Sequence, residues 1–361
     1  MNSDKQTAGV NLFKKAFFGA RAKLFGVDAQ PSVRRGVFLL AALVVFNILV
    51  GIATFMLGAR YPVLSGLSVL AWGFGFRHAM DADHIAAIDN VTRRLLYRGK
   101  HSVGVGVFFA LGHSTIVFLL TLLVLFFTPF AQEHFDAWKG VGAVIGATVS
   151  SVFLLGIGII NIVVLFKLFA VWKDLRAGKE NAYHGHMHLG GPIEKIFRPL
   201  LKLVDQSYKM YFVGFLFGLG FDTATEVGLL AISALAVNSV PPIAVLLLPL
   251  SFMAGMTLLD TLNGLCMLGI YAWGVIDENR RVLYNINITL ISLLSALLIG
   301  ITTGLRIIGS YFGLHGGVFY YAQNISLNYV GYGLLALFVL IWVFALVALR
   351  AKSNTPNTLS V

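Results

Sequence analysis

Apolar runs of about twenty residues recur along the whole 361-residue chain, and they leave few possible folds. A bilayer core requires roughly 20 apolar residues per helical crossing, and it contains no water to satisfy an exposed backbone. The mean hydropathy is +0.83, and only 12% of the residues are charged. Thirty-eight glycines fit this class, since small residues let membrane helices approach closely. The sequence therefore predicts an all-α polytopic membrane protein.

We expect eight transmembrane helices, at 36–58, 62–89, 103–128, 140–169, 210–237, 242–272, 283–306 and 328–349. The 27 Lys and Arg residues are distributed unevenly around these spans: 23 lie on one side, three on the other, and Arg77 within the membrane. Since Lys and Arg concentrate in cytoplasmic loops, both termini are predicted to be cytoplasmic. Topology thus explains the net charge of +11, and we expect no nucleic-acid partner.

The spans divide the chain into five parts. These are a basic amphipathic cytoplasmic segment at 1–35, spans 1–4 at 36–170, a cytoplasmic histidine-containing loop at 171–209, spans 5–8 at 210–349 and a cytoplasmic tail at 350–361. The first segment does not resemble a cleavable signal peptide. The loop contains HGHMH at 184–188, which is either a weak metal-capturing tract or a solvated linker. The single cysteine, Cys266, excludes an internal disulfide and a cysteine-built metal site.

Two pairs of similar motifs indicate an internal repeat. FGFRHAMDADH, from Phe74, resembles FGLGFDTATEV, from Phe217; FALGHST, from Phe109, resembles FMAGMTL, from Phe252. Both pairs are separated by 143 residues. The first pair lies in spans 2 and 5, which cross the membrane in opposite directions. We therefore predict an inverted repeat of spans 2–4 and 5–7, a signature of secondary transporters, against the alternative of chance similarity between Gly/Phe-rich helices.

Span 2 contains the unusual stretch FRHAMDADHIAAIDN at 76–90, with one arginine, two histidines and three aspartates. Charged side chains at the bilayer centre cost several kcal/mol each, so they face a cavity, form pairs or bind an ion. On a continuous helix His78, Asp81 and His84 share one face, which favours a divalent-metal half-site. Asp83 lies off that face; it would orient a neighbouring histidine, or join the metal ligands if the helix is unwound.

Other spans place polar residues near the same depth of the membrane. His113 in span 3 is a further candidate metal ligand. Candidates for metal binding or proton coupling are Asn47, Asp222, Glu226, Met256 and Asp260. Arg77 precedes Asp81 by four residues and is a candidate intramembrane charge partner. For Asn47 and Asp260, a simple hydrogen bond to a neighbouring helix remains the alternative.

Four motifs in order make the chain resemble the nickel/cobalt transporter (NiCoT) family over nearly its whole length. They are HX4DH, formed by His78, Asp83 and His84, then LGHST at 111–115, LGFDTATE at 219–226 and GMTLLD at 255–260. The resemblance implies a single-component permease for high-affinity Ni²⁺ or Co²⁺ uptake, in which the HX4DH residues are required and Asn47 cooperates with them. Related proteins with a similar motif export nickel and cobalt, so export remains an alternative.

The leading hypothesis is a secondary transporter, not an enzyme, that imports Ni²⁺, with Co²⁺ as a second candidate, across the inner membrane of a bacterium. No Walker-type loop occurs, so the membrane potential or a proton gradient would supply the energy. An intramembrane metalloenzyme is disfavoured because no HExxH motif exists, and a haem carrier using His78 and His113 because of the nearby aspartates. We expect no cofactor besides the transported ion, and no partner besides the ion and the bilayer.

Overall fold

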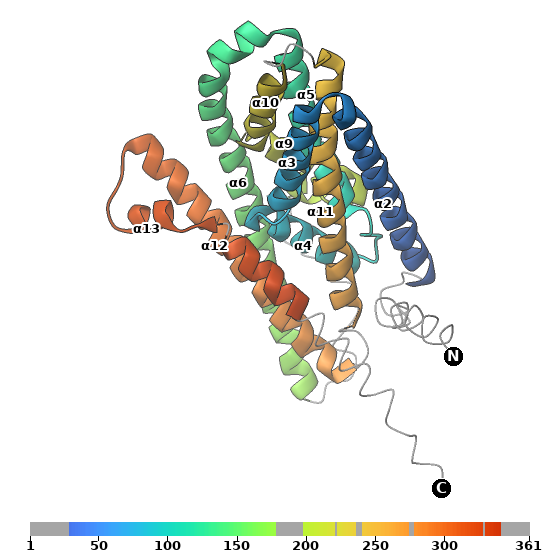
Figure 1. Ribbon diagram of the computed structural model, residues 1–361. Helices are drawn as coiled ribbons and strands as arrows, with labels where there is room; N and C mark the ends of the chain where they lie inside the picture. Colours follow the sequence, from blue (N-terminus) through green and yellow to red (C-terminus); the bar gives the residue numbers. More distant parts are fainter. Residues whose placement is uncertain are drawn as a thin grey trace, which may run out of the picture.

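A computed structural model describes residues 29–177, 198–220, 222–235, 240–273, 278–327 and 329–340. Within these ranges every regular element is helical (Figure 1). Most of the predicted N-terminal segment, the HGHMH tract and the C-terminal tail lie outside the described residues.

The helices follow one another in the order of the expected spans. Their bounds are α2 Ala29–Arg60, α3 Pro62–His78, α4 Ala82–Tyr97, α5 Val105–Phe126, α6 Thr128–Arg176, α8 Arg198–Leu203, α9 Met210–Gly218, α10 Asp222–Leu235, α11 Leu247–Trp273, α12 Glu278–Phe312 and α13 Val318–Asn324. Short 3₁₀ helices precede α9 and α11, at Ser207–Lys209 and Pro242–Leu246. Helical structure resumes at 329–340.

Five helices of the described part are long and apolar enough to cross a membrane, or six if the bent pair Val318–Asn324 and Tyr329–Leu340 forms one span. The candidates are Arg34–Arg60, Val105–Phe126, Gly140–Arg176, Pro242–Leu268 and Asn285–Phe312. The most apolar 18-residue stretch of the first candidate has a mean hydropathy of 2.7, the highest of the five, yet only 17% of that stretch is buried. An apolar surface of that length fits lipid rather than water, so this is a multi-pass membrane protein.

The helices predicted as continuous at 62–89 and 210–237 are each interrupted in the structure. α3 ends at His78 and α4 begins at Ala82; α9 ends at Gly218 and α10 begins at Asp222. Asp81 in the first break is extended, with φ −65° and ψ 141°. Short aspartate side chains compete with the helical backbone for hydrogen bonds, which favours a break here. The single helix face expected for His78, Asp81 and His84 on a continuous helix is therefore not formed.

α3 packs directly on α11 through glycines. A Cβ atom on Gly75 would lie only 2.0 Å from the carbonyl oxygen of Phe252. A Cβ on Gly255 would lie 2.4 Å from the carbonyl oxygen of Trp72. No side chain fits between the two backbones, so these glycines set the close approach of the helices.

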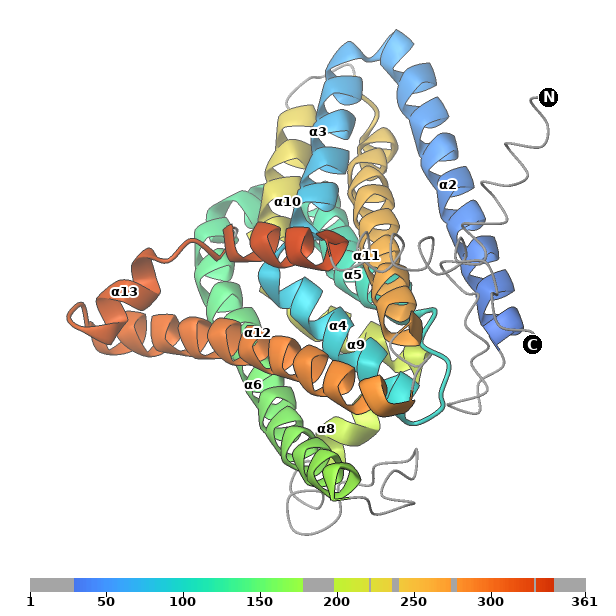
Figure 2. The same ribbon diagram turned by 90° about the horizontal axis from the view of Figure 1, so that it is seen from below.

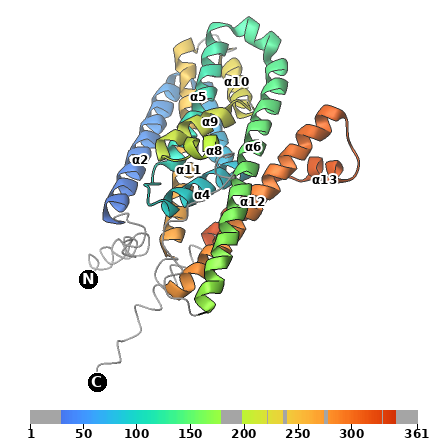
Figure 3. The ribbon, with the colours of Figure 1, turned by 180° about the vertical axis from the view of Figure 1, so that it is seen from behind.

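α5 packs on α9 in the same manner. A Cβ on Gly112 would lie 1.9 Å from the carbonyl oxygen of Tyr211, and one on Gly214 would lie 1.9 Å from that of Phe109. α3 and α11 run downwards in Figure 1, whereas α5 runs upwards. Figure 3 shows α9 and α5 side by side from behind.

α6 and α12 form a third long helix pair, seen in Figures 1 and 2. The Ser151 hydroxyl on α6 donates a hydrogen bond of 2.8 Å to the carbonyl oxygen of Gly300 on α12. The helical stretch 329–340 covers the break between α3 and α4. A Cβ on its buried Gly331 would lie 2.3 Å from the carbonyl oxygen of Met80. The break is thus enclosed by several helices, and the candidate site lies there.

Candidate metal centre

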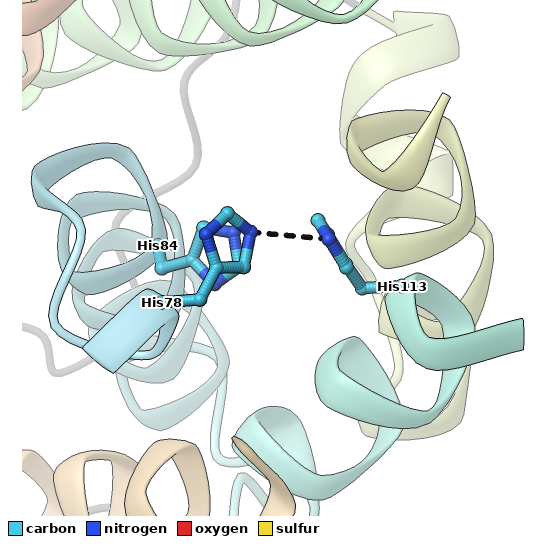
Figure 4. A group of neighbouring side chains, drawn as sticks. All are labelled: His78, His84 and His113. Carbon is cyan, nitrogen blue, oxygen red and sulfur yellow. Dashed lines mark hydrogen bonds between the residues drawn. The ribbon is translucent and has the colours of Figure 1, made fainter. Parts of the chain in front are cut away.

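Three histidines meet beside the break in span 2. His78 is the last residue of α3, His84 lies in the first turn of α4, and His113 comes from the middle of α5. One ring nitrogen from each can be chosen so that all three lie within 4.8 Å of one another. Figure 4 shows His78 and His84 on one side of the group and His113 facing them. The break brings the first two rings together, with centroids 4.5 Å apart.

The spacing of the imidazoles suits a transition-metal ion. Nε2 of His78 lies 3.1 Å from Nε2 of His113. With metal–nitrogen bonds of about 2.0–2.1 Å, these two nitrogens would subtend about 100° at a shared ion. That angle lies between the octahedral and tetrahedral values, and imidazole is a suitable ligand for Ni, Cu, Zn and Fe.

Two carboxylates lie beside two of these rings. Oδ2 of Asp81 lies 2.7 Å from Nδ1 of His78, which leaves Nε2 directed toward His113. Oδ2 of Asp260, on α11, lies 3.8 Å from Nδ1 of His84. Asp260 is fully buried, and neither of its oxygens has a hydrogen-bond partner among the described residues. A carboxylate behind an imidazole fixes the ring and raises its basicity as a ligand, so both aspartates are suited to support the histidines.

Asp83 has a different environment from Asp81. Its Oδ1 accepts a hydrogen bond of 3.0 Å from the backbone N–H of His84, and its Oδ2 accepts one of 3.0 Å from the hydroxyl of Ser150 on α6. The carboxylate therefore joins the start of α4 to α6. A negative charge in the first turn of a helix is also favoured by the helix dipole.

A cavity of about 270 Å³ lies in front of the histidines. Its lining includes His78, Asp81, Asp83, His84, His113, Gly146, Ala147, Ser150, Phe217, Gly220, Thr303, Arg306 and Leu327. Arg306 is half-buried near the end of α12 and donates hydrogen bonds to the carbonyl oxygens of Ala322 and Ile325. The cavity thus extends from the histidines to the part of the molecule where α12 meets α13. Its volume leaves room for an ion with several water molecules.

Phenylalanine rings surround the inner end of the cavity. Phe109 contacts His84 edge-on at a centroid distance of 4.8 Å, and Phe217 lies 6.3 Å from the same ring. Phe252 lies 6.2 Å from His78 and 6.5 Å from His113. Such an apolar shell limits solvent access and lowers the local dielectric constant, which strengthens the interaction of a cation with the site.

Other predicted site residues lie elsewhere. Asn47 donates to the carbonyl oxygen of Ala254 and accepts from Nε1 of Trp72, so it joins α2 to α11 and α3. Met256 is buried, and its sulfur accepts a hydrogen bond from Ser114. Neither Asn47 nor Met256 lines the cavity.

Arg77 is exposed, and its guanidinium lies 5.7 Å from the centre of the Phe74 ring. Asp222 and Glu226 belong to α10, but their side chains lie outside the described part of the structure.

Several residues at or near the site are not recognisable from the sequence. Ser150 and Arg306 line the cavity. A serine within an apolar helix and an arginine near a helix end do not stand out in the sequence. Arg93 was counted in a loop, yet it lies within α4 and is only 2% exposed. The available signal was the spacing. Arg93 follows Asp89 by four residues, so the two side chains lie on one face if the helix continues past residue 89.

Several known proteins are similar to this chain over most of its length. The family described as high-affinity nickel-transport protein, NicO, matches residues 64–348. A high-affinity nickel transport protein of Cupriavidus necator is 39% identical over 323 residues, which are 88% of this chain and 92% of that protein. The nickel transporter NixA of Staphylococcus aureus is 39% identical over 80% of this chain and 86% of its own. The cobalt transport protein NhlF of Rhodococcus rhodochrous is 35% identical over 89% of this chain and 94% of its own. No solved structure matches.

Proposed function

This chain belongs to the NicO family of high-affinity nickel-transport proteins, and we propose that it is a secondary transporter that imports Ni²⁺ through the site formed by His78, His84 and His113. The family and the relatives are transport proteins and not enzymes. The proposal depends on one observation: three imidazoles from three helices converge next to a cavity inside a membrane protein.

The proposed topology has eight spans, cytoplasmic termini and an inverted repeat of spans 2–4 and 5–7 in a bacterial inner membrane. The charge distribution supports the orientation, since the ends of α4 and α6 are basic. Two matched glycine contacts support the repeat. α5 meets α9 at Gly112, and α11 meets α3 at Gly255. These glycines are 143 residues apart, which is the spacing of the sequence motifs.

The transport cycle we propose begins in the cavity. A hydrated divalent ion enters past Thr303 and Ser150 and is attracted by the carboxylates of Asp81 and Asp83. It then loses water as imidazole nitrogens replace the aqua ligands. The imidazoles must be neutral to coordinate, so protons compete with the metal. The membrane potential contributes about 2.3 kcal/mol per charge per 100 mV, and about twice that for a divalent ion.

Co²⁺ is the second substrate that we propose. The support is the similarity to a cobalt transport protein, together with a set of imidazole ligands that does not strongly separate neighbouring first-row metals.

Radioactive nickel uptake into proteoliposomes with an inside-negative potential tests the proposal. The wild-type protein is expected to accumulate nickel. Replacement of His78, His84 or His113 by alanine should reduce uptake by about 100-fold or more, because two remaining imidazoles hold a metal far less tightly. His101→Ala is the matched control, since His101 is exposed and does not line the cavity.

Normal nickel uptake by the His84→Ala variant would contradict the assignment of His84 as a metal ligand. Nickel efflux from loaded vesicles under the same potential, without uptake, would instead favour an exporter. An excess of cobalt that leaves nickel uptake unchanged would remove Co²⁺ as a substrate.

A further inference from the structure

A second polar cluster lies on α4, beyond the histidines and away from the cavity. It consists of Asp89, Asn90 and Arg93 on α4, Asn161 on α6, and Thr289 and Ser292 on α12. All six side chains are at most 5% exposed. None of them lines the cavity that contains the histidines.

The guanidinium of Arg93 is the centre of this cluster. Its NH1 donates a hydrogen bond of 2.7 Å to the hydroxyl of Thr289, and its NH2 donates one of 2.5 Å to Oδ1 of Asn161. A longer contact of 3.5 Å joins NH2 to Oδ1 of Asn90. A single buried side chain therefore connects α4 to both α6 and α12.

Two further bonds reinforce the connection. Asn161 donates a hydrogen bond of 2.5 Å to Oδ1 of Asn90, and the hydroxyl of Ser292 donates one of 2.6 Å to Oδ2 of Asp89. Hydrogen bonds to charged groups are stronger than neutral ones, and a network in a low-dielectric interior is costly to break in part. The fully bonded arrangement of the cluster is therefore favoured over a partly bonded one.

The position of the cluster relates it to transport. Arg93 follows His84 by nine residues on the same helix, which is about 13–14 Å along its axis. It lies toward the basic end of α4, whereas the cavity extends toward Arg306. α6 and α12 contribute Ser150 and Thr303 to the cavity wall and Asn161 and Thr289 to the cluster. The cluster thus lies on the direct line between these helices from the histidines toward the basic end of α4.

We propose that Arg93 closes the cytoplasmic side of the transport path, and that its guanidinium must leave Thr289 and Asn161 before the metal is released. The proposal rests on the transport function and orientation given above. A positive charge is well suited to this role, since it repels the divalent ion while it remains in place. Asp89, the adjacent carboxylate, then becomes the first anionic group that the released ion meets.

Sided labelling of a cavity cysteine tests the proposal. The native cysteine is removed as Cys266→Ser, and Ala147→Cys on the cavity wall is the reporter. With Arg93 present, a membrane-impermeant thiol reagent should label the reporter from the periplasmic face only. In Arg93→Ala, labelling from the cytoplasmic face should rise by about tenfold or more, because each lost charged hydrogen bond favours the open form by about that factor.

Three further variants control for a general loss of structure. Arg98→Ala removes a basic residue from the end of the same helix and should leave the sidedness unchanged. Arg93→Lys, which retains the charge but lacks the guanidinium fork, should give intermediate cytoplasmic labelling. Thr289→Val removes one hydrogen-bond partner of Arg93 while the volume of the side chain stays nearly constant. It replaces Arg93→Ala in the labelling experiment if that variant does not fold.

Nickel binding separates this inference from the proposed function. Arg93→Ala should bind nickel as the wild type does but no longer accumulate it against a gradient. The inference is overturned if a folded Arg93→Ala or Thr289→Val reporter is still labelled from the periplasmic face alone. A wild-type protein that neither binds nor transports nickel would overturn the proposed function instead.

Discussion

Three aspartates near the histidines have three different structural roles. Asp81 contacts Nδ1 of His78, Asp260 lies behind His84, and Asp83 accepts hydrogen bonds from the start of α4 and from Ser150. Residue type alone does not distinguish these roles. The backbone break separates the roles of Asp81 and Asp83, because it directs the two carboxylates toward different neighbours.

Ser150 and Ser151 form a matched pair for testing the role of Asp83. Ser150 donates to the Asp83 carboxylate, whereas Ser151 donates to the backbone of α12. Ser150→Ala should raise the nickel concentration for half-maximal uptake by about tenfold, since a hydrogen bond to a charged group contributes about 1.5–3 kcal/mol. Ser151→Ala should lower the yield of folded protein and leave that concentration unchanged. If both variants reach half-maximal uptake at the same nickel concentration, Ser150 does not affect the affinity of the site for nickel.

At the scale of whole elements, broken helices explain how the site forms. An unbroken span 2 would place His78 and His84 about 9 Å apart along the helix axis. The break shortens that distance, so both rings reach His113 on a neighbouring helix. Non-helical backbone at membrane depth occurs where it is enclosed by protein or lines a cavity, and here it does both.

Gly331 and Gly333 provide a test of this enclosure. Gly331 touches the backbone of the break at Met80 and Ala82, whereas a Cβ on Gly333 would meet nothing within 4 Å. Gly331→Val should displace the break and lower nickel transport at least about tenfold, because a misplacement of about 1 Å in a preorganised site is costly. Gly333→Val should transport normally. Uptake and nickel affinity are measured on equal amounts of folded protein, and equal values for both variants would contradict this role of Gly331.

Much of the helical architecture could be predicted from hydropathy, because the lengths of α5, α11 and α12 are set by the same apolar runs that define a span. His78, His84 and His113 could be named because imidazole is rare in such runs. The break could not be predicted, since it depends on the competition between aspartates and backbone in an enclosed setting. Arg93 was missed because a basic residue near a span end is usually solvated.

Considered as a whole molecule, the protein brings the three proposed ligands together from α3, α4 and α5 only when these helices are packed. Metal binding at this site would therefore be linked to the folded state. An ion that binds only the folded protein stabilises it by about 2.7 kcal/mol at 100 times its dissociation constant. The size of this effect depends on free metal concentration and on intact histidines.

Thermal unfolding in detergent tests that linkage. The reporter is a thiol-reactive dye that reads exposure of Cys266, the single cysteine of the chain. Ni²⁺ should raise the midpoint of unfolding by several degrees, as expected for a gain of this size. Mg²⁺ at the same concentration should not, since it prefers oxygen ligands. A shift of equal size in a variant lacking His78 and His84 would locate the stabilising ion elsewhere.

The glycine contacts also limit how the molecule can change shape. Backbone touches backbone between α3 and α11 at Gly75 and Gly255, and between α5 and α9 at Gly112 and Gly214, so no side chain separates the helices at these points. We therefore expect the two helices of each pair to move together in any transport cycle.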